Sequence, residues 1–148
     1  MSVAMSERQE IIMNFGCAPS LDDILTLTRT VLGALPDELV ELADGLEIDV
    51  QDFPDEVAEQ DENIEDPYDL LALYRSAKEL SPGIEKKDAE GNDLLILYRR
   101  PILDFWCESG ETFEATLRQI IVEEIASQND FAEDEIDEMV SRHHQGVL

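Results

Sequence analysis

The segment from Ser109 to Val140 constrains the fold most strongly, because it contains a helix that is apolar on nearly every face. The apolar positions that follow helical spacing, with two more on the opposite side, are Phe113, Leu117, Ile120, Ile121, Ile125, Val122 and Ala126. This pattern predicts a helix buried nearly all round. Two adjacent carboxylates, Glu123 and Glu124, interrupt it, and a buried carboxylate is costly unless it is paired or protonated. They are the first candidates for chemistry, and a solvated edge of the helix is the alternative.

The length and charge of the chain limit its class and its partners. A chain of 148 residues has the usual size of one domain with one core. Its 10 basic and 36 acidic residues give a net charge of -26, which excludes nucleic acids and anionic membranes and favours a basic partner or a cation. Cys17 and Cys107 lack metal-type spacing and indicate free thiols. With no signal peptide and no membrane-length apolar run, we expect a cytoplasmic protein.

The first half of the chain predicts helices and a strand after an N-terminal tail of residues 1–19. Ser20 to Asp23 resembles a capping box, so a helix should follow and end at Gly33. A short helix is expected from Pro36 to about Ala43. Residues 46–51 alternate between apolar and polar, as a half-buried strand does. Residues 54–69 are strongly acidic and predict a solvated loop, with or without one helical turn.

The second half predicts a further strand and three helices. Residues 70–74 fit a strand or a turn, whereas residues 94–98 are apolar throughout and predict a strand covered on both faces. A short helix is expected over 101–107 with Trp106 packed inward, and the central helix should end near Asn129. Asp130 to Glu133 has capping-box spacing, which predicts a helix over 132–142 and a tail over 143–148. We therefore expect one α+β domain over residues 20–142, with a small sheet packed on the two C-terminal helices.

The stretch from Glu123 to Glu133, E-E-I-A-S-Q-N-D-F-A-E, resembles the H-E-x-x-H-x-x-G-x-x-D pattern of small bacterial zincin-like metallopeptidases, a minimal-zincin family. Other segments similar to that family, in the same order, are Leu35-Pro36-Asp37-Glu38, Leu70 to Tyr74 and Leu97 to Leu103. The resemblance spans roughly residues 20–140. It implies a minimal zincin-like fold, in which a small sheet packs against helices that include a buried active-site-type helix.

Compared with that pattern, the metal-binding positions of this chain are altered. Glu123 and Ser127 stand in place of the two histidines, Asp130 in place of the glycine, and Glu133 in place of the aspartate that is the possible third ligand. Only Glu124 is unchanged, and the resemblance implies that it is the candidate general base for a zinc-bound water. Catalytic zinc needs about three protein ligands, usually including histidine, and a serine hydroxyl is a poor one. We therefore expect no metal cofactor, although zinc is the cofactor of the family.

Three functions from different classes remain open. The first is a zincin-like domain that has lost zinc binding and peptidase activity and acts as a peptide-binding, protein-binding or regulatory module. Its docking strand would include Leu94, Ile96 and Tyr98, because zincins offer the edge of their sheet to an extended peptide. The second is a metal-dependent peptidase or hydrolase in which Glu123 and Glu133 hold a hard cation and Glu124 is the base. The third is an acidic interaction protein that presents residues 55–69 to a basic partner.

Overall fold

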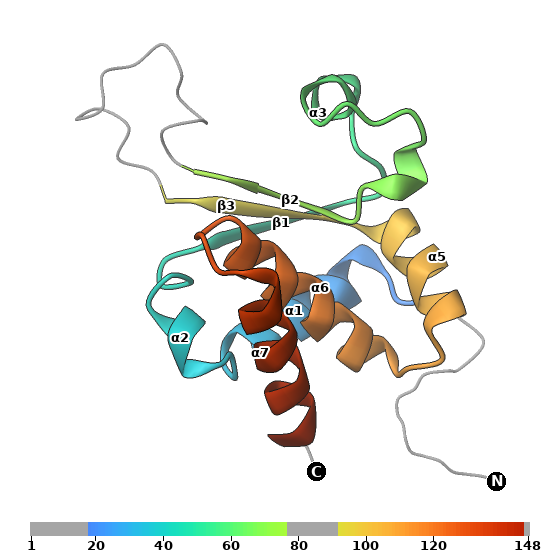
Figure 1. The fold of residues 1–148 in the computed structure, drawn as a ribbon. Helices are drawn as coiled ribbons and strands as arrows, with labels where there is room; N and C mark the ends of the chain where they lie inside the picture. Colours follow the sequence, from blue (N-terminus) through green and yellow to red (C-terminus); the bar gives the residue numbers. More distant parts are fainter. Residues whose placement is uncertain (1–17, 77–91, 147–148) are drawn as a thin grey trace, which may run out of the picture.

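The computed structural model describes residues 18–76 and 92–146, with side chains up to Ser141 in the last helix (Figure 1). Its helices are α1 (Leu21–Leu32), α2 (Asp37–Val40), α3 (Glu56–Asp61), the 3-10 helix η1 (Pro67–Asp69), α5 (Arg99–Ser109), α6 (Phe113–Ser127) and α7 (Glu133–Gly146). Its strands are β1 (Glu47–Gln51), β2 (Ala72–Arg75) and β3 (Leu94–Tyr98). The predicted α+β class is confirmed. Most of the predicted N-terminal tail, including Cys17, lies outside the described residues.

The three strands form one mixed sheet in the order β1-β3-β2. The central strand β3 pairs in parallel with β1 and antiparallel with β2. Leu95 and Leu97 of β3 are fully buried in the main core, and Tyr98 is buried in a second cluster with Leu70 and Leu73. Figure 1 shows the helices α1, α6 and α7 on one side of the sheet and α3 on the other. The prediction that residues 94–98 form a strand covered on both faces is therefore confirmed.

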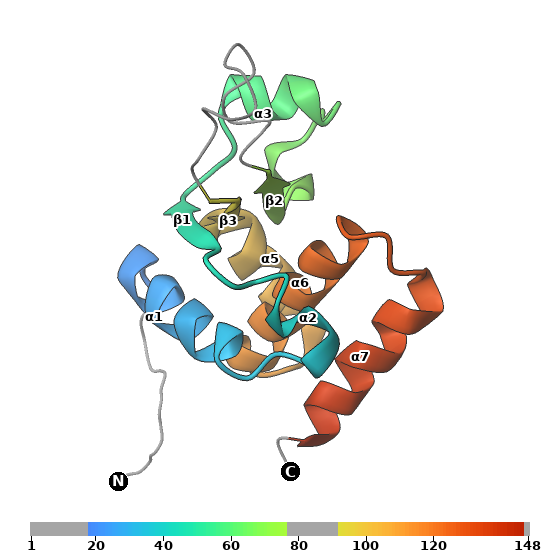
Figure 2. The ribbon, with the colours of Figure 1, turned by 90° about the vertical axis from the view of Figure 1, so that its left-hand side faces the viewer.

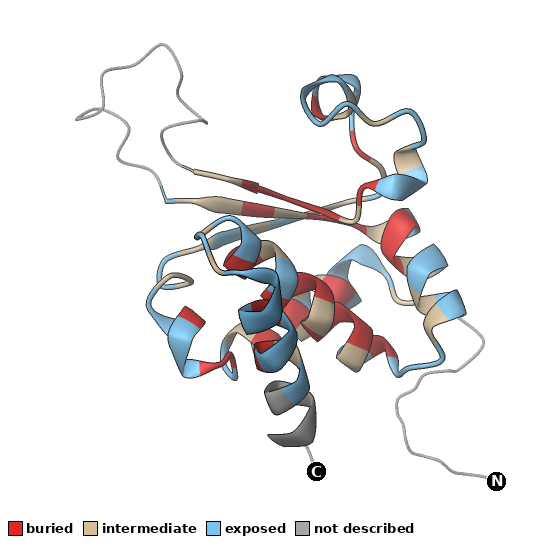
Figure 3. Ribbon diagram, viewed as in Figure 1, coloured by how far each residue is buried: buried red, intermediate tan, exposed pale blue. Residues whose placement is uncertain are grey.

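Helix α6 lies beneath the sheet between α1 and α7 (Figure 2). It begins where the hydroxyl of Thr112 accepts a hydrogen bond from the N–H of Ala115, at 3.1 Å. Nine of its 15 residues are buried, including Leu117, Ile121 and Ile125, and Figure 3 shows it as one of the most buried helices. The predicted helix that is buried nearly all round is confirmed.

Local capping explains where the first helix begins. The hydroxyl of Ser20 accepts from the N–H of Asp23 at 3.1 Å, and the carboxylate of Asp23 accepts from the N–H of Ser20 at 2.9 Å. This is the predicted capping box, and it satisfies two backbone donors at once.

The acidic loop predicted over 54–69 contains more helix than expected. Asp55 caps α3 by accepting from the N–H of Ala58 at 2.8 Å, and η1 follows.

Helices α5 and α7 extend beyond their predicted boundaries. Helix α5 begins at Arg99, two residues before the predicted start, and Pro101 lies in its first turn. Proline is tolerated there because the first N–H groups of a helix have no partner within the helix. Helix α7 continues to Gly146, so the backbone of residues 143–146 belongs to the helix and not to a tail. Over the described ranges, no helix is both long enough and apolar enough to cross a bilayer.

Candidate functional site

A groove of about 570 Å³ runs between α6, the start of α7 and the stretch that leads from η1 into β2. The four residues at the metal and base positions of the motif all line it, namely Glu123, Glu124, Ser127 and Glu133. Asp69 and Asp137 line it as well, so five carboxylates face one groove. Figure 2 shows α6 below β2 and beside α7, so that it contacts both. The groove therefore concentrates negative charge beside one edge of the sheet.

Glu124 is the partly buried carboxylate of this groove, and it is held against the sheet. Its Oε2 atom accepts a hydrogen bond from the backbone N–H of Tyr74 in β2, at 3.2 Å. Burial raises the pKa of Glu124 to about 7; the charge of Glu62 also raises it, and the bond from Tyr74 lowers it. A carboxyl group with a pKa near neutrality can accept a proton at neutral pH, as a general base must.

The other motif residues already have partners or face solvent. Glu123 is exposed and accepts a hydrogen bond from the side-chain amide of Gln119 at 3.2 Å. The hydroxyl of Ser127 donates to the backbone carbonyl of Glu124 at 3.1 Å, as serines in helices commonly do. Glu133 is exposed at the start of α7.

These residues do not fit the zinc of the motif. One carboxylate, that of Glu123, and one hydroxyl, that of Ser127, stand at the two positions where the motif has histidines, and the hydroxyl is turned toward its own helix. Among the side chains that the structure describes, no three of His, Cys, Asp or Glu are grouped as metal ligands. The side chains of His143 and His144 lie outside that description.

The turn between α6 and α7 has the backbone conformation that the glycine of the motif provides. Asp130 stands at this position with φ of 66°, in the left-handed region that favours glycine. The turn is closed by the side chain of Asn129, which donates to the carbonyl of Ile125 at 2.7 Å. Asp130 therefore forms a left-handed turn at the position where the motif that this segment resembles has glycine.

The predicted capping box over 130–133 is wrong by two residues. The carboxylate of Glu135 accepts from the N–H of Ala132 at 2.8 Å, so Ala132 precedes the helix and Glu135 closes the cap. The left-handed turn at Asp130 is the cause, because it comes before the cap and shifts the helix start to Glu133.

The predicted docking strand also needs correction. Leu94, Ile96 and Tyr98 belong to β3, whose two backbone edges are already paired with β1 and β2. The outer edge beside the groove belongs to β2. The N–H of Tyr98 donates to the carbonyl of Leu71 at 3.0 Å, so the backbone groups of Leu71 point toward β3. In an antiparallel pair, successive residues direct their N–H and C=O groups alternately toward and away from the partner strand. The backbone groups of Ala72 and Tyr74 therefore point away from β3.

Sequence reasoning missed several groups in or beside the groove. The contact between Tyr74 and Glu124 joins residues 50 positions apart, and no local pattern predicts it. Tyr74 is anchored further by its phenol, which donates to Asp93 at 2.5 Å, and burial raises the pKa of the phenol to about 12. Asp137 was detectable, because it lies four residues after Glu133 on the same helix face.

Comparison with known proteins supports the family resemblance. A family model described as zincin-like metallopeptidase matches residues 43–143, which include the whole sheet, α6 and most of α7. A comparison with curated proteins found no match. The matched segment begins after α1 and α2.

Proposed function

Because the chain belongs to the family of zincin-like metallopeptidases, we propose that it binds an extended peptide or protein segment and has lost zinc-dependent hydrolysis. The observation that carries the proposal is the donor set of the groove. Ser127 and two exposed carboxylates stand at the ligand positions, and the hydroxyl of Ser127 donates to its own helix. Glu124 keeps the position of the general base, but the altered ligand positions leave it without a zinc-bound water to deprotonate.

The outer edge of β2 is the proposed docking site. An extended segment can add a strand there, because the backbone N–H and C=O groups of Ala72 point away from β3. Alternate side chains of such a segment point to the same side. With five carboxylates in the adjoining groove, we propose a partner that carries lysine or arginine at alternate positions.

The free, exposed thiol of Cys107 suits a reducing compartment, and we propose the cytoplasm.

Calorimetric titration with two short peptides tests this function. The peptides have the same alternating sequence, with lysine in one and glutamate in the other. We expect the lysine peptide alone to bind, with an affinity that falls as salt is raised. The double variant Glu133→Gln with Asp137→Asn should weaken binding about tenfold, which corresponds to about 1.4 kcal/mol.

A matched control separates the groove from the overall charge. Asp104 and Glu108 are also exposed and four residues apart, but they lie on α5. The double variant Asp104→Asn with Glu108→Gln makes the same change in net charge and should leave binding unchanged. Equal losses in both double variants would show that the lysine peptide responds to the charge of the whole molecule and would reject the groove.

A metal-dependent hydrolase is the second candidate, and the raised pKa of Glu124 favours it. Elemental analysis of protein purified without chelators or a nickel column separates the two functions. The binding proposal expects no stoichiometric zinc, manganese or magnesium after dialysis. About one ion per chain, together with peptide hydrolysis that disappears in Glu124→Gln, would establish the hydrolase instead.

A further inference from the structure

Glu124 closes one position of the β2 edge at which an extended segment is proposed to dock. The backbone groups of Ala72 and Tyr74 point away from β3, so a strand added to β2 would pair with both residues. The N–H of Tyr74, however, already donates to Oε2 of Glu124 at 3.2 Å. The carboxylate therefore stands where an added strand would place a backbone carbonyl.

The second oxygen of Glu124 is open to the groove. Glu124 is half-buried and lines the groove together with Asp69, Ile120 and Ile136. Within the described part of the chain, its Oε1 atom has no hydrogen-bond partner. This atom is not enclosed by protein either, since a described side-chain atom that is both enclosed and unpartnered occurs only in Arg118. A ligand in the groove can therefore reach Oε1.

Building on the proposed function, we propose that the edge receives the free amino terminus of its partner, whose α-ammonium group donates to Oε1 of Glu124. In antiparallel addition, the partner chain runs from the Tyr74 end of β2 toward Ala72. Its first residue then lies opposite Leu73, and its second residue pairs with Ala72. No residue precedes these two, because Glu124 already accepts the N–H that the carbonyl of a preceding residue would take.

Other parts of a partner chain fit this position less well. An internal segment places a carbonyl opposite Tyr74 and must displace Glu124 to pair with the N–H group there. A carboxyl terminus brings a second negative charge to a groove that already contains Asp69, Glu133 and Asp137. An ammonium group is favoured instead, because charge-assisted hydrogen bonds are stronger than neutral ones and partial burial strengthens them further.

Calorimetric titration at pH 7.5 tests the proposal with the alternating lysine peptide in two forms. One form has a free amino terminus, and the other is acetylated and carries one more lysine at its carboxyl end, so that the net charges are equal. Both forms are amidated at the carboxyl end. At this pH most α-amines are protonated and most Glu124 is ionised, since their pKa values are about 7.7–8.0 and about 7. We expect the free form to bind at least about tenfold more tightly, which corresponds to about 1.4 kcal/mol.

The two forms separate failure of this proposal from failure of the proposed function. Equal affinities, or tighter binding of the acetylated form, would overturn the amino-terminal site and leave strand addition to β2 standing. Binding of neither form would reject the docking edge, and the amino-terminal site with it.

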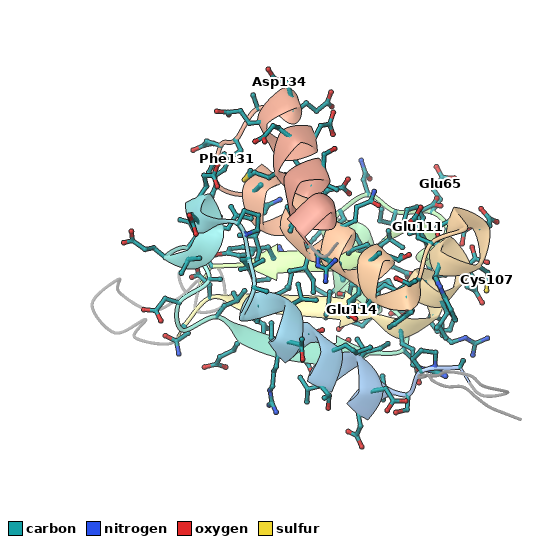
Figure 4. The ribbon with its side chains drawn as sticks, turned by 90° about the horizontal axis from the view of Figure 1, so that it is seen from below. Glu65, Cys107, Glu111, Glu114, Phe131 and Asp134 are labelled. Carbon is teal, nitrogen blue, oxygen red and sulfur yellow. The ribbon has the colours of Figure 1, made fainter. Side chains whose placement is uncertain are left out.

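Substitutions assign the preference to Glu124. Glu124→Gln keeps an acceptor for the N–H of Tyr74 but removes the charge, so the free form should lose its advantage over the acetylated form. Glu108→Gln is the matched control, because it removes one exposed glutamate from α5. Figure 4 shows its neighbour Cys107 well away from Asp134 at the start of α7. A preference for the free form that persists in Glu124→Gln, or that disappears in Glu108→Gln, would overturn the proposal.

Discussion

At the scale of single residues, Glu124 is destabilising whenever it is ionised in the folded protein. Burial raises its pKa from the ordinary 4.5 to about 7, and one pKa unit corresponds to about 1.4 kcal/mol. The cost of ionisation is therefore at most about 3 kcal/mol. The pKa of Glu124 is higher in the folded state, so protonated Glu124 favours folding. This contribution to the free energy of unfolding is fully present below pH 4.5 and is lost as the pH rises through about 7.

The substitution Glu124→Gln should therefore stabilise the protein at neutral and alkaline pH. The amide has a similar size and can still accept the N–H of Tyr74, but it carries no charge. Urea unfolding at pH 8 should show a gain of up to about 3 kcal/mol, and at pH 4 no difference from the unmodified protein. The exposed neighbour provides the control, since Glu123→Gln removes a charge from a solvated position and should change the free energy of unfolding at pH 8 by less than about 0.5 kcal/mol. A less stable Glu124→Gln at pH 8 would mean that the carboxylate holds a cation or a charged partner.

At the scale of elements, the start of α7 shows how one turn displaces a helix boundary. Asp130 takes a left-handed conformation, and the helix is then capped through Ala132 and Glu135. Glu133 lies in the same first turn and faces the groove without closing the cap. Both glutamates place negative charge near the positive end of the helix dipole. Of the two glutamates, only Glu135 also accepts a hydrogen bond from the backbone N–H of Ala132.

This difference predicts unequal effects of two similar substitutions. Glu135→Ala should lower the free energy of unfolding by about 0.5–1 kcal/mol more than Glu133→Ala, because only Glu135→Ala leaves the N–H of Ala132 without its acceptor. Both changes remove one charge from the first turn, so their dipole effects cancel in the comparison. Urea unfolding at neutral pH provides the measurement. A larger loss for Glu133→Ala would restore the capping box that was predicted over residues 130–133.

At the scale of the whole molecule, repulsion among carboxylates opposes folding. The net charge is -26, and only a few ion pairs are formed by the described residues, for example Arg75 with Asp61 and Arg99 with Asp52. Exposed pairs of this kind contribute little to stability. Like charges spread over a compact surface therefore leave a net unfavourable term that salt can screen.

Added sodium chloride should accordingly stabilise the protein. Between about 20 mM and about 0.5 M salt, the free energy of unfolding should rise by on the order of 1 kcal/mol, which raises Tm by about 2–4 °C for a chain of this size. Calorimetry at pH 8 measures the shift. At pH 4, where many carboxylates are protonated, the shift should be smaller. A Tm that falls with salt at pH 8 would show that attractive pairs dominate the electrostatics.

Much of this fold could be predicted from the sequence because its signals are local. The capping box at Ser20, the alternation in β1 and the apolar spacing in α6 each depend on residues a few positions apart. The motif from Glu123 to Glu133 likewise identified four residues that line one groove, since helical spacing brings three of them together. Boundaries were less accurate where neighbouring conformations compete, as at Asp130 and at Arg99.

The sequence by itself determined most of the elements, the charge and the resemblance of residues 123–133 to a zinc-binding motif, because each of these follows from residue type and short-range spacing. Only the tertiary structure decided that β3 is the central strand and that, among the described residues, β1 and β2 lie at the edges of the sheet, since pairing depends on partners far apart in the chain. The same holds for the bond from Tyr74 to Glu124, which joins β2 to α6. These features arise where separate elements meet, and no periodicity within one element specifies what packs against it.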